Sequence, residues 1–219
     1  MKNNELRRLM LLLGLMLFFL QGDNYATAPL LVDLANDFNI TAGKATFLVT
    51  AYMIPFGLFT LLFGPLGDRV GKGRILKVSA LLTAVFSFLS AIMADFNLVC
   101  SVRVFNGLFA AGVMPVSMAL IGEKAGNDPE VLHSSLSKTM GLMFLGGAIG
   151  PTLGGWLSQF GGWRLVFGFY GVIEFILALL IILLIPSTQP AKQQGSFLSV
   201  YTDTIKTPGV YKTVPILFI

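Results

Sequence analysis

The apolar positions along this chain gather in long blocks rather than in the short periodic patterns of a water-soluble fold. A helix of roughly 20 mainly apolar residues is needed to cross about 30 Å of hydrocarbon. The blocks therefore predict membrane-spanning helices at residues 9–29, 45–66, 75–94, 98–121, 139–158 and 163–185. Strands are not expected, because backbone groups cannot stay unpaired in lipid and the blocks are too uniformly apolar for barrel strands.

After the sixth block the chain becomes polar. Residues 186–212 are rich in Pro, Gln, Ser and Thr, which predicts a cytoplasmic linker. Residues 213–219 begin another apolar run that is too short to span a membrane. We therefore expect this sequence to be the N-terminal half of a chain about twice as long, cut as a seventh helix begins.

Positive charges between the blocks predict the orientation, because short cytoplasmic segments carry an excess of Lys and Arg. Lys and Arg are frequent in the N-terminal tail, in the second and fourth connections and after the sixth block. The other connections offer only Lys44 and Arg164. The N-terminus and the linker are thus expected in the cytoplasm, with the protein passing several times through the cell membrane.

Composition narrows the classes of function. Hydrophobic residues make up 55% of the chain and charged residues 12%, whereas a soluble domain has roughly 25% charged residues. The net charge of +4 does not indicate nucleic-acid binding, since the cations lie beside apolar blocks and not on a patch with aromatic residues. The only cysteine, Cys100, and the only histidine, His133, leave little for a disulfide, a metal site or an enzyme's catalytic group. We expect no metal and no cofactor.

A short internal match suggests a repeat. Residues 64–68 (GPLGD) align with residues 155–159 (GWLSQ), and Gly71 then meets Gly162. The first segment lies after the second predicted helix and the other after the fifth. Three helices separate them, and an odd number inverts the topology. The pattern is typical of an inverted three-plus-three repeat, which in transporters places the substrate site near the midplane.

Apart from Lys77 and Arg164, which lie in the first turn of their predicted helices, the charged residues inside the predicted helices are Asp23, Arg103 and Glu174. A charge near the bilayer centre is costly, so such residues normally face a cavity or a partner. Glu174 is too far from either end of its helix to reach water. A carboxylate tuned to bind and release a proton there would suit a proton-coupled carrier. Arg103 could pair with either acid or hold an anionic substrate group. The alternative is a purely structural ion pair.

Two further segments of the sequence carry glycine-rich motifs. The segment 64–74 (GPLGDRVGKGR) has glycines suited to a tight reversal and basic residues suited to the cytoplasmic face. We call residues 64–74 the gate loop. The residues in it that we expect to matter are Gly64, Asp68, Arg69, Gly71 and Arg74.

The segment 146–155 (GGAIGPTLGG) repeats glycine every four residues. This spacing leaves one helix face bare for a close neighbour. The proline in the segment should kink or loosen the helix. The packing motif comprises Gly146, Gly150, Pro151, Gly154 and Gly155.

Together these segments resemble the major facilitator superfamily, and within it the drug–proton antiporters. The segment 64–74 is similar to the signature loop of the superfamily. Residues 103–111 (RVFNGLFAA) are similar to the arginine motif of the antiporters, although Asn106 stands where glutamine is usual and Phe109 where a glycine is. Residues 146–155 are similar to the motif that marks antiporters.

The resemblance implies an all-α integral membrane protein, the six-helix half of a twelve- or fourteen-helix transporter. It implies proton-coupled export of a small organic compound by alternating access, driven by the proton gradient. The lipid bilayer, the organic substrate and the absent C-terminal half would be the partners. An uptake, sugar or metabolite carrier of the same superfamily is the near alternative. A half-length, non-transporting assembly partner is the alternative from another class.

Overall fold

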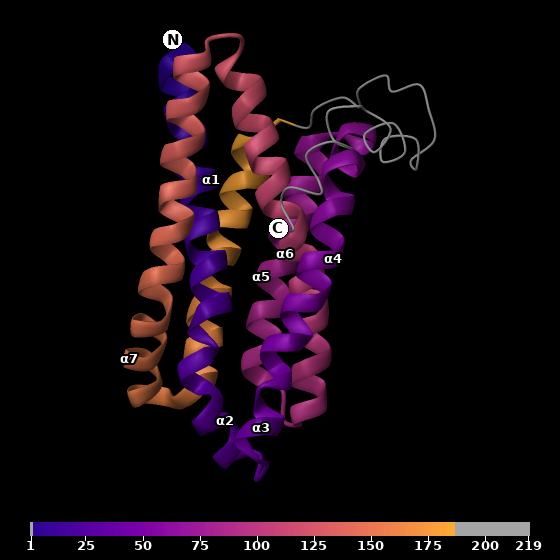
Figure 1. Ribbon diagram of the computed structural model, residues 1–219, viewed down its shortest axis with the longest axis vertical. Coiled ribbons are helices and arrows are strands. Elements are labelled where there is room, and N and C mark those ends of the chain that lie inside the picture. Colours follow the sequence, from indigo (N-terminus) through magenta and orange to yellow (C-terminus); the bar gives the residue numbers. More distant parts are fainter. Residues whose placement is uncertain (1, 187–219) are drawn as a thin grey trace, which may run out of the picture.

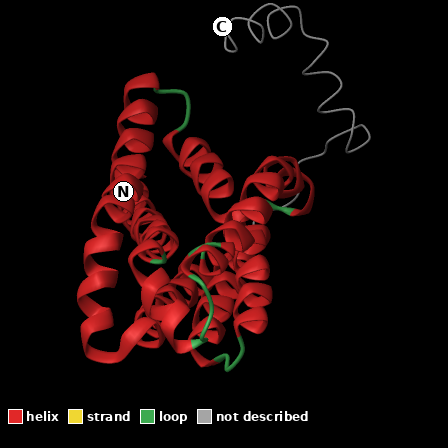
Figure 2. Ribbon diagram, turned by 60° about the horizontal axis from the view of Figure 1, so that its bottom comes forward, coloured by secondary structure: helices red, strands yellow, loops and turns green. Residues whose placement is uncertain are grey.

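The computed structural model describes residues 2–186, and every regular element in this range is helical (Figures 1 and 2). The predicted linker beyond Pro186 and the predicted start of a seventh helix lie outside the described residues. The elements are α1 (Lys2–Ala26), the 3-10 turn η1 (Ala28–Leu30), α2 (Leu31–Asp37), α3 (Ala42–Ala45), α4 (Phe47–Val70), α5 (Lys72–Ile92), α6 (Phe96–Ala125) and α7 (Pro129–Leu184).

Among the described residues, five helical stretches are long and apolar enough to cross a membrane, where the sequence predicted six. The difference lies in α7, which contains 56 residues. Its backbone leaves the helical region at Gly161 (φ −155°, ψ 21°) and Gly162 (φ 64°, ψ −167°). This break separates a first arm of α7, residues 129–160, from a second arm, residues 163–184. The first arm contains the predicted span 139–158, and the second arm covers the predicted span 163–185 except its last residue. The positive φ of Gly162 is a conformation that residues with a Cβ rarely adopt.

Helix boundaries follow hydrogen bonding rather than hydropathy. The helix α1 begins at Lys2, seven residues before the predicted span, because helical hydrogen bonding continues past the apolar block. Two later helices begin directly after an aspartate. The Asp95 carboxylate accepts from the amides of Asn97 and Leu98, at 2.8 and 3.3 Å. Asp128 caps α7 in the same way. Such caps satisfy amides that a helix start leaves without partners.

The gate loop departs from its prediction. Gly64, Asp68 and Arg69 all lie inside α4, and Arg74 lies in the first turn of α5. The reversal rests on Gly71 alone, whose φ is 106°. The other glycine positions remain helical, because one residue with positive φ is enough to end a helix and start the next.

The long helices run up and down in a bundle (Figure 1). The helix α1 packs along α7, α4 packs along α6, and α5 packs against both α6 and α7. The N-terminus, the α4–α5 turn and the α6–α7 turn lie toward one end (Figure 1). The short helices α2 and α3 lie at the other end. Two apolar clusters fill the interior, one around Leu13, Leu17 and Val113 and one around Leu30, Trp163 and Phe167.

Candidate functional site: a buried charged cluster

A buried ion pair joins α1 to α6. An Nη atom of Arg103 lies 2.7 Å from the carboxylate of Asp23, and the side chains are 0% and 2% exposed. The sequence left open which acid Arg103 would meet. The structure pairs it with Asp23, 80 residues away in the chain. Removing one partner of such a pair typically costs about 3–5 kcal/mol, because the other charge is left buried alone.

Neighbouring polar groups complete the contacts of the guanidinium. Its second Nη donates to the hydroxyl of Thr27 at 3.0 Å, and its first also donates to the Asn106 side-chain oxygen at 3.2 Å. The Asn106 amide nitrogen in turn donates to the backbone carbonyl of Thr83 on α5, at 2.8 Å. Asn106, which stands where glutamine is usual in the arginine motif, therefore links Arg103 to a third helix, α5.

Two aromatic rings enclose the same guanidinium. The Cζ of Arg103 lies 4.8 Å from the ring centre of Tyr52 on α4 and 4.9 Å from that of Phe167 on α7. Guanidinium groups are attracted to aromatic faces at such distances, more strongly when water is excluded. Arg103 thus contacts α1, α4 and α7 directly and α5 through Asn106.

Glu174 lies in the same region without a partner. Its side chain is fully buried, and neither carboxyl oxygen makes a hydrogen bond to the described residues. The carboxyl group interacts electrostatically with both Asp23 and Arg103. Buried charged residues within the described part of the chain are thus two acids and one base. Because Asp23 occupies the base, Glu174 has no counter-ion.

The glycine motif of the first α7 arm lies against α1 at Gly146, Gly150 and Gly154. A Cβ on Gly150 would lie 2.7 Å from the carbonyl oxygen of Gly22, and a Cβ on Gly154 would lie 2.7 Å from the Cβ of Ala26. Gly146 lies against the backbone of Phe18.

One residue of the motif differs from expectation. Gly155 is not closely packed, since its Cβ would meet Pro29 at an ordinary 3.8 Å. Pro151 lies inside the helix, and the backbone dihedral angles of α7 leave the helical region at Gly161 and Gly162. Glycine tolerates such angles because it has no Cβ.

Charged side chains also meet at the end of the bundle where the N-terminus lies. Lys72 pairs with Asp68 at 2.7 Å and with Glu123 of α6. Glu5 pairs with Lys124 at 2.9 Å. Asp68 of the gate loop thus joins the end of α4 to the first residue of α5.

A second ionic contact lies at the opposite end. Asp37 at the end of α2 accepts a hydrogen bond from the Trp163 ring nitrogen, at 3.0 Å, and pairs with Arg164. The contact holds the short helix α2 beside the break in α7.

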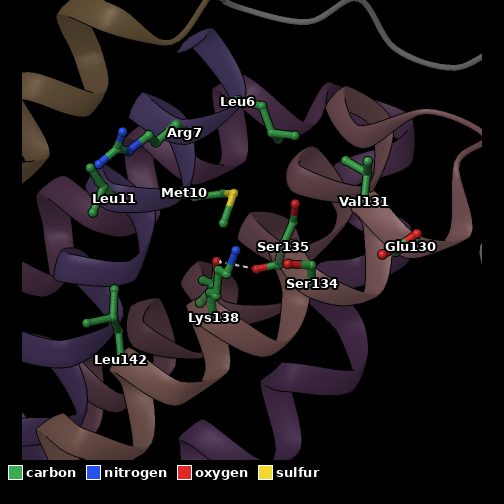
Figure 3. A pocket seen from close by; sticks show the side chains of 11 residues that line it. Leu6, Arg7, Met10, Leu11, Glu130, Val131, Ser134, Ser135, Lys138 and Leu142 are labelled. Carbon is green, nitrogen blue, oxygen red and sulfur yellow. Dashed lines mark hydrogen bonds between the residues drawn. The ribbon is translucent and has the colours of Figure 1, made fainter. Parts of the chain in front are cut away.

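An open cavity of about 480 Å³ lies apart from the buried charges, between the N-terminal part of α1 and the first arm of α7. Figure 3 shows Leu6 and Met10 of α1 facing Ser135 and Lys138 of α7 across it. None of the three buried charged residues lines it. Within residues 2–186, no three His, Cys, Asp or Glu side chains gather closely enough to hold a metal ion.

Comparison with protein families decides the class. The family model described as Major Facilitator Superfamily matches residues 13–217, nearly the whole chain. The chain belongs to the Major Facilitator Superfamily. The sequence-based exclusion of an enzyme is confirmed, because this superfamily and the curated relatives are transporters.

Several superfamily members are related in sequence. The MFS-type transporter YybF of Bacillus subtilis is 28% identical over 78% of this chain and 43% of its own length. The riboflavin transporter RibZ of Clostridioides difficile is 26% identical over 75% of this chain and 36% of its own length. Citrate exporter 1 of Aspergillus niger is 25% identical over 84% and 33%. The chain therefore spans less than half the length of these curated relatives.

Solved superfamily structures share the fold. A bacterial homologue of the human lysosomal transporter Spinster, in an inward-facing conformation, matches 93% of this chain and 50% of its own, with a TM-score of 0.72 and 18% identity. The peptide transporter POT in complex with sulfate matches 97% and 46%, with a TM-score of 0.76 and 16% identity. At these identities the likeness concerns the fold alone.

Sequence reasoning on this superfamily member selected Asp23, Arg103 and Glu174 but missed Thr27 and Tyr52. Thr27 had a detectable signal, because it lies four residues after Asp23 and so on the same helix face. Tyr52 had none, since its position under Arg103 depends on how α4 packs against α6.

Proposed function

We propose that this protein is a secondary active transporter that exports small organic compounds in exchange for protons, by alternating access. The observation that carries the proposal is the imbalance of buried charge. Two acids, Asp23 and Glu174, share one base, Arg103, in a region that solvent does not reach. When all three groups are ionised, they carry one more negative than positive charge. A bound proton can neutralise this excess.

Glu174 is the better candidate for the proton. An ionised carboxylate that is buried without a donor is far more costly than a neutral one. The arrangement with Asp23 bound to Arg103 is therefore compatible with a protonated Glu174. Release of that proton would create a second anion near Arg103. This anion would compete with Asp23 for the guanidinium, and the competition would alter the packing of the helices that carry these residues. The gate loop at the end of α4 and the glycine motif of α7 would then act in the conformational change.

We further propose that the chain is the N-terminal half of a twelve- or fourteen-helix transporter built as an inverted repeat. In such a repeat, α1, α4 and α5 would correspond to α6 and the two arms of α7, in that order. When each helix is replaced by its counterpart, the contact of α1 with the first arm of α7 becomes the contact of α6 with α4, and the reverse also holds. The helix pairing and the extent of the matched relatives support the proposal.

The remaining proposals concern the surroundings of the protein. The protein would lie in the cell membrane with its N-terminus in the cytoplasm, because Lys and Arg are concentrated on that side of the predicted helices. It would contact the lipid bilayer, its organic substrate and the C-terminal half of the transporter. The proton gradient would supply the driving force and no cofactor would be needed.

The experiment uses the full transporter in inverted membrane vesicles. A cationic fluorescent dye is added outside, a proton gradient is imposed, and both dye accumulation and proton release are recorded. Dye accumulation that depends on the gradient, together with proton movement that depends on the dye, is expected. Equal uptake with and without the gradient would refute proton coupling.

A metabolite carrier is the second candidate, because the relatives include proteins named as a riboflavin transporter and a citrate exporter. The same vesicles distinguish the candidates. Gradient-dependent movement of riboflavin or citrate, with no movement of the dye, would favour the metabolite carrier and reject export of cationic drugs.

A further inference from the structure

Polar atoms without partners gather around the ion pair. Among the buried side chains of the described residues, the Tyr52 hydroxyl and both Glu174 oxygens make no hydrogen bond. Arg103 Nε and Asp23 Oδ1 are also without a partner. Roughly 90% or more of buried polar groups in folded proteins are hydrogen-bonded, so a group of exceptions in one region requires a physical reason.

Tyr52 and Glu174 have complementary chemistry. A phenol can donate a hydrogen bond, and an ionised carboxylate can only accept one. The Tyr52 ring centre lies 4.8 Å from the Cζ of Arg103, which pairs with Asp23, and the phenol also interacts electrostatically with Glu174. The buried residues of α5, the remaining helix of the bundle, include no titratable side chain. Tyr170 of α7 lies nearby, but its hydroxyl already faces the carbonyl of Gly150, at 3.5 Å.

We infer that Tyr52 is a positioning residue of the transport cycle, whose hydroxyl donates to the ionised Glu174 carboxylate in the state that follows proton release. The inference rests on the proton-coupled function proposed above. In the present arrangement Asp23 and Thr27 occupy both Nη atoms of Arg103. A protonated Glu174 can remain without a donor, whereas the ionised form requires one.

The position of Tyr52 makes this bond a link between helices. Its backbone carbonyl lies against Gly107 of α6, and its ring stacks on that of Phe56 with centres 5.7 Å apart. These contacts hold the hydroxyl in place relative to α4. A bond to Glu174 would therefore tie α4, which ends in the gate loop, to the second arm of α7.

Ser87 is one rival donor, and Thr83 on α5 and Ser117 on α6 are two others, since each also carries a buried hydroxyl without a partner among the described residues. A serine or threonine in a helix can donate instead to a backbone carbonyl of the preceding turn. The phenol of Tyr52 extends far from its own backbone and has no such local acceptor. Tyr52 therefore has the stronger need for the carboxylate.

The test follows the protonation of Glu174 in the full transporter. Infrared difference spectra record the carboxyl band as the pH is changed, and Glu174→Gln identifies the band by removing it. Tyr52→Phe removes one oxygen and keeps the ring beneath Arg103. Loss of a donor to the ionised form should move the midpoint of the band, and the pH profile of transport, about one pH unit to the alkaline side. Thermal unfolding verifies that the variant is folded.

Two control variants test whether the shift in the midpoint comes from loss of the Tyr52 hydroxyl. Tyr170→Phe makes the same chemical change on a tyrosine that has another acceptor, and it should leave the midpoint unchanged. Ser87→Ala should shift it less than Tyr52→Phe does. An unchanged midpoint in folded Tyr52→Phe, or a larger shift in Ser87→Ala, would overturn the inference. A shifted band in a protein whose transport ignores the proton gradient would reject the proposed function but retain the link between Tyr52 and Glu174.

Discussion

Gly150 packs against the backbone of Gly22, so a larger side chain at position 150 should force α7 away from α1. A Cβ there would lie 2.7 Å from the Gly22 carbonyl oxygen and 2.8 Å from its Cα. Contacts of about 3.4 Å or more are needed, so the helices would have to separate by more than half an ångström before the rest of a leucine is placed. Gly168 in the second arm of α7 is the matched control, because its Cβ would meet only Ala91, at 3.8 Å.

We expect Gly150→Leu to be destabilised by about 2 kcal/mol more than Gly168→Leu, since overpacking typically costs 1–3 kcal/mol. For a chain of this size such a difference corresponds to roughly 4–8 °C in Tm. The assay compares thermal unfolding of the two purified variants in one detergent, then initial transport rates of the full transporter at equal membrane levels.

Gly150→Leu should also lose more transport than Gly168→Leu, because α1 carries Asp23 one residue after the contact. Equal Tm values, or a lower value for Gly168→Leu, would show that close packing at the glycine motif does not limit the stability of the bundle.

Other variants test the buried charges and the extent of the protein. Glu174→Gln in the full transporter should abolish proton-coupled transport while membrane insertion, measured by protease protection, is retained; normal coupling would make Glu174 structural. Arg103→Lys should lower stability by about 1–3 kcal/mol, measured as a Tm decrease, because a lysine cannot serve Asp23 and Thr27 together while lying flat between two rings; an unchanged Tm would contradict this. The 219-residue chain alone should not transport, and uncoupler-sensitive transport in vesicles that contain only this chain would instead favour a dimer of halves.

The helical class and the positions of the spans could be predicted from the sequence because hydropathy is a local property. Lipid as solvent demands long apolar helices, and each predicted span has a helical counterpart among the described residues. The sequence also selected Asp23, Arg103 and Glu174, since a charge inside an apolar block is conspicuous without any structure. It misplaced the gate loop, in which only Gly71 makes the turn, because a glycine in sequence permits a reversal but does not require one.

Only the tertiary structure decided which of these residues meet. Arg103 binds Asp23 from a helix 80 residues away, while Glu174 stays without a partner, and Tyr52 and Phe167 enclose the guanidinium. These contacts depend on the rotation and depth of each helix, and both result from packing over the whole bundle, where Gly107 and Gly150 let backbones approach closely. Local hydropathy therefore placed Asp23, Arg103 and Glu174 within apolar helices, whereas packing between distant segments determined which of them is neutralised.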